Sequence, residues 1–424
     1  MLAILTTHPI QYQVPVWKGL AARGNVPFKV FYMSDQGLEE RFDPGFGKSL
    51  SWDIDLLGNY QCEFLDTYRG TPLDSFWRLR LKRGFGRALR QVGANVLWIQ
   101  GWQVVAYWQA VFEARRAGTE VWLRGETNAR SNADRIGRQF KRLLLRQLLR
   151  RVDRFLYIGE ANRQFYLDQG IASERLAAAP YCVDNVRFAA AAAVARAERD
   201  RIRQEWGIPT ESFCFLFAGK FLPKKRPFDL IEAARCLQHS IQGKKIHLLW
   251  VGTGELGDEL RRACNVCFDA EAKERTNLRR HGAPNASFVG FLNQSEISRA
   301  YVAADCLVLP SDARETWGLV VNEAMASGLP CVVSDGCGCV EDLITPIRPD
   351  LCYPVGEITA LERAMAAAIT DTPPLQLLRG HISKYDVSKT IDAVESLYLE
   401  RTAARSNRNL SHETSKTNRC ANSA

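Results

Sequence analysis

The stretch PSDARETWGLVVNEAMASGLPCVVS, residues 310–334, places two carboxylates eight positions apart. The apolar run before it predicts a buried strand that ends at Pro310, and the pattern from Gly318 onward predicts a helix. Glu315 then lies in the loop and Glu323 in the helix, so both side chains can face one cleft. Carboxylates accept separate bonds from paired hydroxyl groups, and a free helix N-terminus suits a phosphate. The alternative places Glu315 at the helix dipole and Glu323 on a solvated face.

Strand-like and helix-like runs alternate on both sides of this stretch, as in doubly wound parallel sheets. In the first half the predicted strands are Leu2–Thr6, Phe28–Met33, Gln61–Leu65, Asn95–Gln100, Glu120–Arg124, Phe155–Ile158 and Arg175–Ala179. In the second half they are Phe213–Ala218, Lys245–Val251, Ala286–Val289, Cys306–Pro310 and Pro330–Ser334. This alternation predicts two facing Rossmann-like domains with a ligand cleft between the carboxyl ends of their strands.

The 424 residues are too many for one core, which favours two domains of ordinary size. We assign residues 1–187 to the first Rossmann-like domain and residues 205–380 to the second. Residues 188–204, rich in Ala and Arg, are predicted to form a linker helix. Residues 381–405 are predicted to form a C-terminal helix that packs back on the first domain. The polar residues 406–424 are predicted to be disordered.

The net charge of +9 belongs to the first half of the chain, because residues 1–187 hold 27 Lys/Arg against 18 Asp/Glu. Such an excess favours an anionic partner: a membrane surface, a phosphorylated molecule or a nucleic acid. No nucleic-acid-binding motif accompanies the charge, so we expect no nucleic-acid partner. The chain shows neither a signal-peptide pattern nor an apolar run long enough to span a bilayer. We therefore expect a cytoplasmic protein, for which any membrane contact is peripheral and on the cytoplasmic face.

Twelve cysteines are present, and several fall in apolar segments, among them Cys214, Cys236, Cys306 and Cys331. In a reducing compartment such thiols behave as small buried hydrophobes. Two close pairs, Cys264/Cys267 and Cys337/Cys339, are the alternative, a four-thiolate zinc site. The second pair has only one intervening residue, which disfavours that alternative. We expect no metal.

Two glycine-containing loops follow strands of the second half. The run from Ala218 to Lys225 ends a strand with Gly219 and Lys220, which is typical either of an anion site or of an exposed basic turn. The run Gly252-Thr253-Gly254-Glu255-Leu256-Gly257 matches the dinucleotide-binding pattern G-x-G-x-x-G. It follows the second strand of its domain rather than the first, which disfavours a dehydrogenase.

The segment around Glu315 and Glu323 resembles the E-x7-E signature of the retaining glycosyltransferases of family 4, which have the GT-B fold. The resemblance implies that Glu315 lies near the hydroxyls of the transferred sugar and that Glu323 binds the ribose of the nucleotide. Trp317 stands where the family usually has Phe, and the family's Gly-Leu follows as Gly318-Leu319.

The loop from Gly219 to Lys225 is similar to the family's G-R-L-x-x-x-K, whose two cations hold the donor diphosphate. Lys225 matches the family Lys, and Lys220 replaces the usual Arg, which keeps the charge but loses the bidentate fork. Glu315, Lys220 and Lys225 are thus the candidate catalytic residues. The donor-binding residues that the resemblance implies are Gly219, Lys220, Lys225, Gly252, Gly254, Trp317, Gly318, Leu319 and Glu323. Beyond the nucleotide-sugar co-substrate, the resemblance implies no obligatory metal or cofactor.

The acceptor side lies in residues 1–187, where the resemblance is loose. Many family members have a His near the reacting sugar, and Arg124 stands at the corresponding place. Arg cannot act as a base. The acceptor-side candidates are His8, Gln100, Arg124 and Glu126, each of which follows a predicted strand. For His8 the alternative is a turn residue before Pro9.

Two basic stretches, Arg78–Arg90 and Arg135–Arg154, interleave apolar and cationic residues. They suit either an anionic bilayer surface or core-packing elements with a solvated basic face. Membrane binding would imply a lipid-linked acceptor. The function expected is transfer of a sugar from a nucleoside-diphosphate sugar to a hydroxyl, with retention, in cell-surface polysaccharide or glycolipid assembly. The rivals are a catalytically silent nucleotide-sugar-binding protein and another GT-B enzyme, a phosphorylase or a sugar-nucleotide epimerase.

Overall fold

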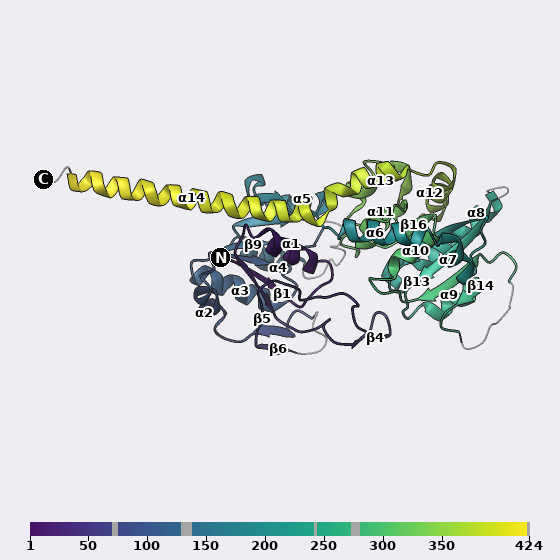
Figure 1. Ribbon diagram of the computed structural model, residues 1–424, viewed down its shortest axis with the longest axis horizontal. Helices are drawn as coiled ribbons and strands as arrows, with labels where there is room; N and C mark the ends of the chain where they lie inside the picture. The colour runs from purple at the N-terminus through teal and green to yellow at the C-terminus, as the bar shows by residue number, and fades with distance from the viewer. Residues whose placement is uncertain (70–74, 129–137, 241–243, 273–279, 422–424) are drawn as a thin grey trace.

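The computed structural model describes residues 1–69, 75–128, 138–240, 244–272 and 280–421, which form two α/β domains side by side (Figure 1). Each domain is built on a seven-stranded sheet whose pairings are all parallel. The predicted fold class, two Rossmann-like doubly wound domains, is confirmed.

The sheet of the N-terminal domain has β8 at its centre, with β1 beside it. Its order is β11 (Leu176–Ala178), β10 (Arg154–Tyr157), β9 (Glu120–Leu123), β8 (Val96–Ile99), β1 (Leu2–Thr6), β2 (Phe28–Tyr32) and β5 (Cys62–Phe64). The sheet of the C-terminal domain has β12 at its centre. Its order is β14 (Asn265–Asp269), β15 (Asn285–Gly290), β13 (Lys245–Val251), β12 (Ser212–Ala218), β16 (Cys306–Leu309), β17 (Cys331–Ser334) and β18 (Cys352–Tyr353).

All the strands predicted from the sequence belong to these sheets, and their ends differ by one residue at most. The sequence missed the edge strands β14 and β18 and two antiparallel hairpins. The hairpins are β3 (Arg41–Asp43) with β4 (Lys48–Leu50) and β6 (Thr67–Arg69) with β7 (Leu79–Leu81). In each hairpin at least one strand is largely exposed, so it lacks the apolar run that marks a strand buried on both faces.

Helices cover both faces of the N-terminal sheet. Along β1, Ala3 and Leu5 pack into one core and Leu2 and Ile4 into the other, because successive strand side chains point to opposite faces. One face carries α2 (Phe85–Gln91), α3 (Val105–Arg116), α4 (Arg138–Leu149) and α5 (Glu160–Asp168). The other face carries α1 (Val14–Arg23) and part of the C-terminal helix α14 (Val387–Ala421).

The C-terminal domain has one continuous core. Its helices are α8 (Pro227–Ser240), α9 (Gly257–Ala263), α10 (Ile297–Ala303), α11 (Leu319–Ala326), α12 (Ile358–Thr370) and α13 (Leu375–Ile382). Single turns of 3-10 helix lie at η3 (Pro223–Lys225), η5 (Pro349–Leu351) and η6 (Ser383–Tyr385), and η4 (Val340–Ile344) is a π-helical turn. A further single turn, η2 (Ser173–Arg175), precedes β11 in the N-terminal domain.

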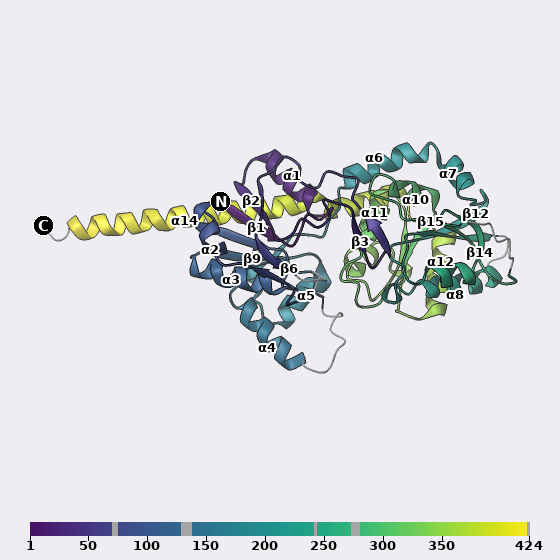
Figure 2. The same ribbon diagram turned by 90° about the horizontal axis from the view of Figure 1, so that it is seen from below.

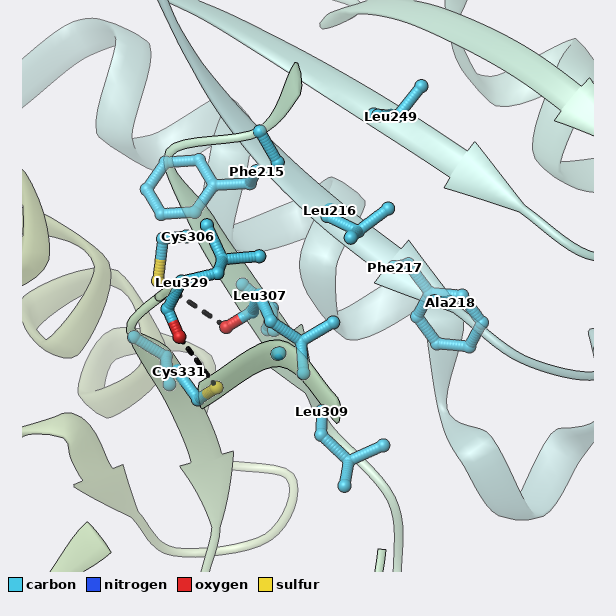
Figure 3. Close-up of a cluster of buried hydrophobic side chains, with 14 of the residues drawn as sticks. Phe215, Leu216, Phe217, Ala218, Leu249, Cys306, Leu307, Leu309, Leu329 and Cys331 are labelled. Atoms are coloured by element: carbon cyan, nitrogen blue, oxygen red, sulfur yellow. Dashed lines mark hydrogen bonds between the residues drawn. The ribbon is translucent and has the colours of Figure 1, made fainter. Parts of the chain in front are cut away.

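Buried cysteines are part of this core. Figure 3 shows Cys306 and Cys331 among leucine and phenylalanine side chains, with each thiol donating to a main-chain carbonyl. Burial raises the pKa of both thiols, so they stay protonated and unreactive. Cys214 is buried as well, but Cys236 is exposed on α8, and the prediction that it is a buried hydrophobe is wrong. Its position faces outward because neighbouring Ala233, Ala234 and Leu237 occupy the buried face.

The segment predicted as one linker helix forms two helices, α6 (Asn185–Arg196) and α7 (Arg199–Glu205). Both pack against α10 of the C-terminal domain, and Phe188, Ile202 and Trp206 lie in its core. Arg199 and Arg203 both form ion pairs with Asp305. Because Asp305 directly precedes β16, these pairs tie α7 to that strand. The segment is therefore an integral layer of the second domain rather than a free connector.

The chain crosses between the domains twice. The two crossings meet at the parallel bridge between Val183 and Asp386, and Cys182 contacts Thr390 nearby. Beyond this point α14 runs back across the N-terminal domain (Figure 1). Ile391, Val394 and Tyr398 are buried against α1 and the sheet.

Disorder was predicted for residues 406–424; α14 continues to Ala421 and projects beyond the domain (Figures 1 and 2). Residues 387–421 contain neither Gly nor Pro. Once the first turns are held by the domain, nothing in the local sequence ends the helix.

The two basic stretches differ in structure. In the first, β7 and α2 bury Leu79, Leu81 and Phe85, as expected of core-packing elements. In the second, α4 buries Leu148 and Leu149 but leaves Leu143 and Leu144 exposed, and residues 129–137 lie outside the described part of the chain. Within the described residues, no helix is both long and apolar enough to cross a bilayer.

Candidate active site in the interdomain cleft

A cavity of about 470 Å³ lies between the two domains. Its C-terminal wall comes from the loops that follow β12, β13, β15 and β16, and its N-terminal wall includes residues that follow β1 and β9. The carboxyl ends of parallel strands meet at one edge of a sheet, which is why residues distant in sequence converge here.

Glu315 and Lys225 form an ion pair on the floor of this cavity. The Lys225 ammonium donates to Glu315 Oε2, and the two side chains are only 17% and 15% exposed. Lys225 is held in the turn η3 by its main-chain N–H, which donates to Leu222 at 2.9 Å. The turn thus fixes the main chain of Lys225, the ion pair with Glu315 holds its ammonium, and the carboxylate sits in the loop predicted for it.

Glu323 is buried on α11 at 4% exposure, so its alternative placement on a solvated face is wrong. Its carboxylate accepts hydrogen bonds from the hydroxyls of Tyr12 and Tyr301, the first at 2.9 Å. Burial raises the pKa of Glu323, and the two tyrosine hydroxyls oppose that shift. Since Tyr12 follows β1, this hydrogen bond links the two domains across the cleft.

Lys220 is paired with a carboxylate from the other domain. Its ammonium donates to both oxygens of Asp43 at 2.9 Å and lies 4.8 Å from the centre of the Phe46 ring. Burial alone would raise the pKa of Asp43, but the hydrogen bond and charge of Lys220 lower it below its ordinary value. The Asp43 carboxylate therefore binds the Lys220 ammonium at the place where the resemblance implies the donor diphosphate.

Asp43 belongs to a segment, residues 43–53, that we call the strap. The strap extends from the N-terminal domain and is hydrogen-bonded to the C-terminal domain along its length. Thr253 donates to the carbonyl of Phe46 at 2.6 Å, Asn293 donates to the carbonyl of Ser51 at 2.7 Å, and the Ser295 hydroxyl donates to Asp53. Phe46 and Trp52 face Phe291 across the cleft.

The two glycine loops are packed on each other. A Cβ on Gly252 would lie 2.0 Å from the carbonyl oxygen of Gly219, and one on Gly254 would lie 2.7 Å from the main chain of Phe221. Main-chain bonds join the loops, from Gly219 to Val251 and from Phe221 to Thr253, both at 2.9 Å. The G-x-G pattern thus permits close approach of two backbones. Gly252 lines the cavity, whereas Gly254 is not among its lining residues.

The start of α11 completes the donor-side wall. Gly318 has a φ of 106° and lies against Leu309, which suits only glycine, and Leu319 follows it into the cavity lining. Trp317 is buried, donates from Nε1 to Asn322 at 2.8 Å and stacks on Tyr181. Its indole therefore holds the loop that carries Glu315.

Of the four acceptor-side candidates, only Gln100 and Glu126 line the same cavity. Glu126 lines the main cavity and accepts a hydrogen bond from Tyr181 at 2.6 Å. Gln100 lies in a second, adjoining cavity. Arg124 is buried, donates to the carbonyl of Pro180 at 3.0 Å and lines neither cavity, so it supports the domain junction. His8 contacts Thr7 and also lines neither cavity, and burial lowers its pKa to about 4.

Apart from Glu126, sequence reasoning missed the main-cavity residues that the N-terminal domain contributes. They are Tyr12, Phe46, Trp52 and, at the domain junction, Tyr181. No local pattern marks them, because each acts on a partner in the other half of the chain. Among the described residues, no cluster of three or more His, Cys, Asp or Glu side chains is arranged to hold a metal ion.

Comparison with known proteins gives this geometry a family context. Residues 198–385 match the family described as glycosyl transferases group 1. A GDP-mannose-dependent alpha-mannosyltransferase of Mycobacterium tuberculosis is 31% identical over 212 residues, which is 50% of this chain and 47% of that protein. An Escherichia coli enzyme, UDP-Gal:alpha-D-GlcNAc-diphosphoundecaprenol alpha-1,3-galactosyltransferase, is 26% identical over 202 residues, or 46% and 47% of the two chains. The chain thus spans about half the length of these curated relatives.

Solved structures match over nearly the whole chain. A glycosyltransferase from Rickettsia africae superposes with a TM-score of 0.67 at 12% identity, covering 94% of this chain and 98% of the other. Anabaena HepE in complex with UDP gives a TM-score of 0.67 at 14% identity, with 94% and 99% covered. The protein therefore has the GT-B fold, and its C-terminal domain matches the group 1 glycosyl transferases.

Proposed function

We propose that this protein transfers a glycosyl unit from a nucleoside-diphosphate sugar to a hydroxyl group, with retention of the anomeric configuration as in family 4. The observation that carries the proposal is the convergence of Lys220, Lys225, Glu315 and Glu323 on one interdomain cavity. Two cations beside two carboxylates suit a ligand that is anionic at one end and rich in hydroxyls at the other. Relatives named for UDP- and GDP-sugar donors support the same class of ligand.

In this proposal the residues have separate roles. Lys220 and Lys225 hold the diphosphate, where negative charge develops as the glycosyl bond breaks. Glu323 binds the ribose hydroxyls in exchange for a tyrosine hydroxyl, and Glu315 binds hydroxyls of the transferred sugar. In this proposal the two lysines neutralise the charge of the diphosphate. We therefore predict that no metal ion is obligatory. Closure of the domains excludes water from the donor.

The test of the proposal is a donor screen with the full chain. UDP- and GDP-sugars are compared by thermal shift, and release of free nucleotide is then measured with a panel of glycoside acceptors. We expect one sugar nucleotide to raise Tm and to release its nucleotide when an acceptor is present. Stabilisation without release, across the panel, would favour a silent binding protein. Failure of every sugar nucleotide to raise Tm would contradict the proposal.

The strap makes a prediction about donor affinity. A diphosphate that binds Lys220 must displace Asp43, so Asp43→Asn should tighten binding of the selected nucleoside diphosphate. The pair is about one-third exposed on each side, and such pairs contribute roughly 0.2–1 kcal/mol, so Kd should fall by about 1.4- to fivefold. Isothermal titration calorimetry measures this change. Asp53→Asn, in the same strap but bonded to Ser295, is the control. Weaker binding by Asp43→Asn would show instead that the carboxylate assists the donor.

We also propose that the N-terminal domain contacts an anionic membrane surface on its cytoplasmic side through α4, and that the acceptor is lipid-linked. Leu143 and Leu144 are exposed there at 56% and 43%, and Arg146 and Arg150, close to them in the sequence, are exposed as well. Such a pattern suits the bilayer interface. The protein should sediment with phosphatidylglycerol vesicles at low salt, and Leu143→Glu with Leu144→Glu should reduce sedimentation several-fold. Lack of sedimentation by the native chain would remove this part of the proposal.

A further inference from the structure

A second cavity, of about 230 Å³, lies at the carboxyl ends of β8 and β9 in the N-terminal domain. We call it the β8–β9 cavity. Its lining residues are Gln100, Gly101, Trp102, Gln103, Gly125, Glu126, Thr127 and Thr316. Glu126 and Thr316 also line the main cavity, so the two spaces adjoin. A molecule held in the β8–β9 cavity would therefore lie next to the donor site.

Trp102 gives this cavity a rigid, flat, apolar wall. Its indole stacks on Phe165 with ring centres 5.8 Å apart and planes 17° apart. On another side the ring lies directly against the main chain of Gly125, where a Cβ would be 2.2 Å from Trp102 Cζ3. Glycine at position 125 thus allows the indole its place. A fixed aromatic surface of this kind binds the apolar face of a ring at little cost in conformational entropy.

The rest of the lining is polar, and one group in it lacks a partner. Gln100 is 8% exposed, and within the described part of the chain its Nε2 is buried with no hydrogen-bond partner. A buried donor without an acceptor costs about 1–3 kcal/mol, a cost that a bound acceptor oxygen would remove. Gln103, Thr127, Thr316 and the Glu126 carboxylate add further hydrogen-bonding groups. None of the eight lining residues is a Lys or an Arg.

We propose that the β8–β9 cavity binds the accepting end of the acceptor, and that this end is an uncharged, hydroxyl-bearing ring, a sugar or cyclitol unit. Trp102 contacts the apolar face of the ring and Gln100 Nε2 donates to one of its oxygens. Glu126, at the junction of the two cavities, accepts a hydrogen bond from the hydroxyl that faces the donor. A cavity of this volume is below the roughly 300–1,000 Å³ of sites for drug-sized ligands and suits one ring.

The lining argues against a phosphate-bearing ring in the same place. A phosphate would find no cation among these eight residues and would face the Glu126 carboxylate. Burying an anion without a counter-charge is strongly unfavourable. The inference rests on the proposed function, because it assumes that a donor occupies the adjoining cavity.

The test uses the full chain at saturating donor, with initial rates measured for two acceptor sets. One set holds methyl glycosides and myo-inositol, and the other holds their phosphate monoesters. We expect transfer to neutral rings, and we expect Trp102→Ala and Gln100→Leu each to raise the acceptor KM about tenfold while the donor Kd stays unchanged. Trp102→Phe should restore part of the affinity. Trp77→Ala, which removes an indole that is 70% exposed and lines neither cavity, is the matched control.

The outcomes separate this inference from the proposed function. Donor binding and slow release of nucleotide without acceptor report on the donor site alone. If they are intact and only phosphorylated rings accept the sugar, or if both Trp102→Ala and Gln100→Leu leave the acceptor KM unchanged, the inference is overturned and the proposed function stands. If no donor binds, the proposed function itself fails.

Discussion

Replacing Lys225 with alanine is expected to lower kcat for sugar transfer by about 10²–10³-fold, the usual loss when one preorganised group at a developing charge is removed. Lys225 is the better placed of the two candidate lysines. Its main chain is fixed in the turn η3, and its ammonium is 17% exposed beside Glu315. A charge held in this way needs no reorganisation when the diphosphate departs. Steady-state kinetics with the donor chosen by the screen measure the effect.

Two further variants make this result specific. Lys29→Ala removes the lysine of another Lys–Glu pair, with Glu63, on the far strands β2 and β5, and should leave kcat unchanged. Lys225→Ala also leaves the Glu315 carboxylate without its counter-charge. Adding Glu315→Gln removes that unpaired charge, so recovery of transfer in the double variant to the level of Glu315→Gln alone would show that Lys225 only neutralises Glu315. We expect no recovery.

Replacing Glu323 with alanine is expected to raise the donor Kd by about 10- to 100-fold, because hydrogen bonds to a charged group contribute roughly 1.5–3 kcal/mol each. The carboxylate is buried and already bonded to two tyrosine hydroxyls. A ribose can replace one of these without any change in the buried charge. Glu315→Ala should act differently and mainly lower kcat, since Glu315 lies where the transferred sugar is expected. Calorimetry gives Kd, and saturation kinetics give kcat.

The tyrosines provide the control for Glu323. Tyr301→Phe removes one hydroxyl from the carboxylate and leaves the carboxylate itself in place, so its effect on donor Kd should be smaller than that of Glu323→Ala. If Glu315→Ala and Glu323→Ala instead give equal and small changes in both constants, the assigned roles are wrong. A circular dichroism spectrum of each variant shows whether the fold is retained.

Much of the fold could be predicted because the central strands are buried on both faces. Runs such as Leu2–Thr6 and Ser212–Ala218 are mostly apolar and buried throughout, and each is followed by a helical pattern. Edge strands have only partial burial, so β14 was missed. The C-terminal helix was predicted, but its continuation to Ala421 was not, since polar composition was taken as a sign of disorder.

The sequence also led us to expect Lys225, Glu315 and Glu323 on one wall of the cleft, and all three line the cavity. Lys225 and Glu315 lie in loops that follow strands of one sheet, and Glu323 lies on the helix after the second loop; parallel topology brings such loops together. The acceptor half was predicted less well. Gln100 and Glu126 line cavities, whereas Arg124 faces Pro180 and Tyr181 at the domain junction. A strand end gives the position of a residue but not the direction of its side chain.

By itself the sequence determined the two sheets, the cleft between them and the charged residues on its C-terminal wall. Only the tertiary structure decided what those residues contact. Tyr12 reaches Glu323 across 311 positions and Asp43 reaches Lys220 across 177. Spacing along one segment reports which residues share a face of that segment. It carries no information on a partner from another domain, because that partner is chosen by how the two domains pack.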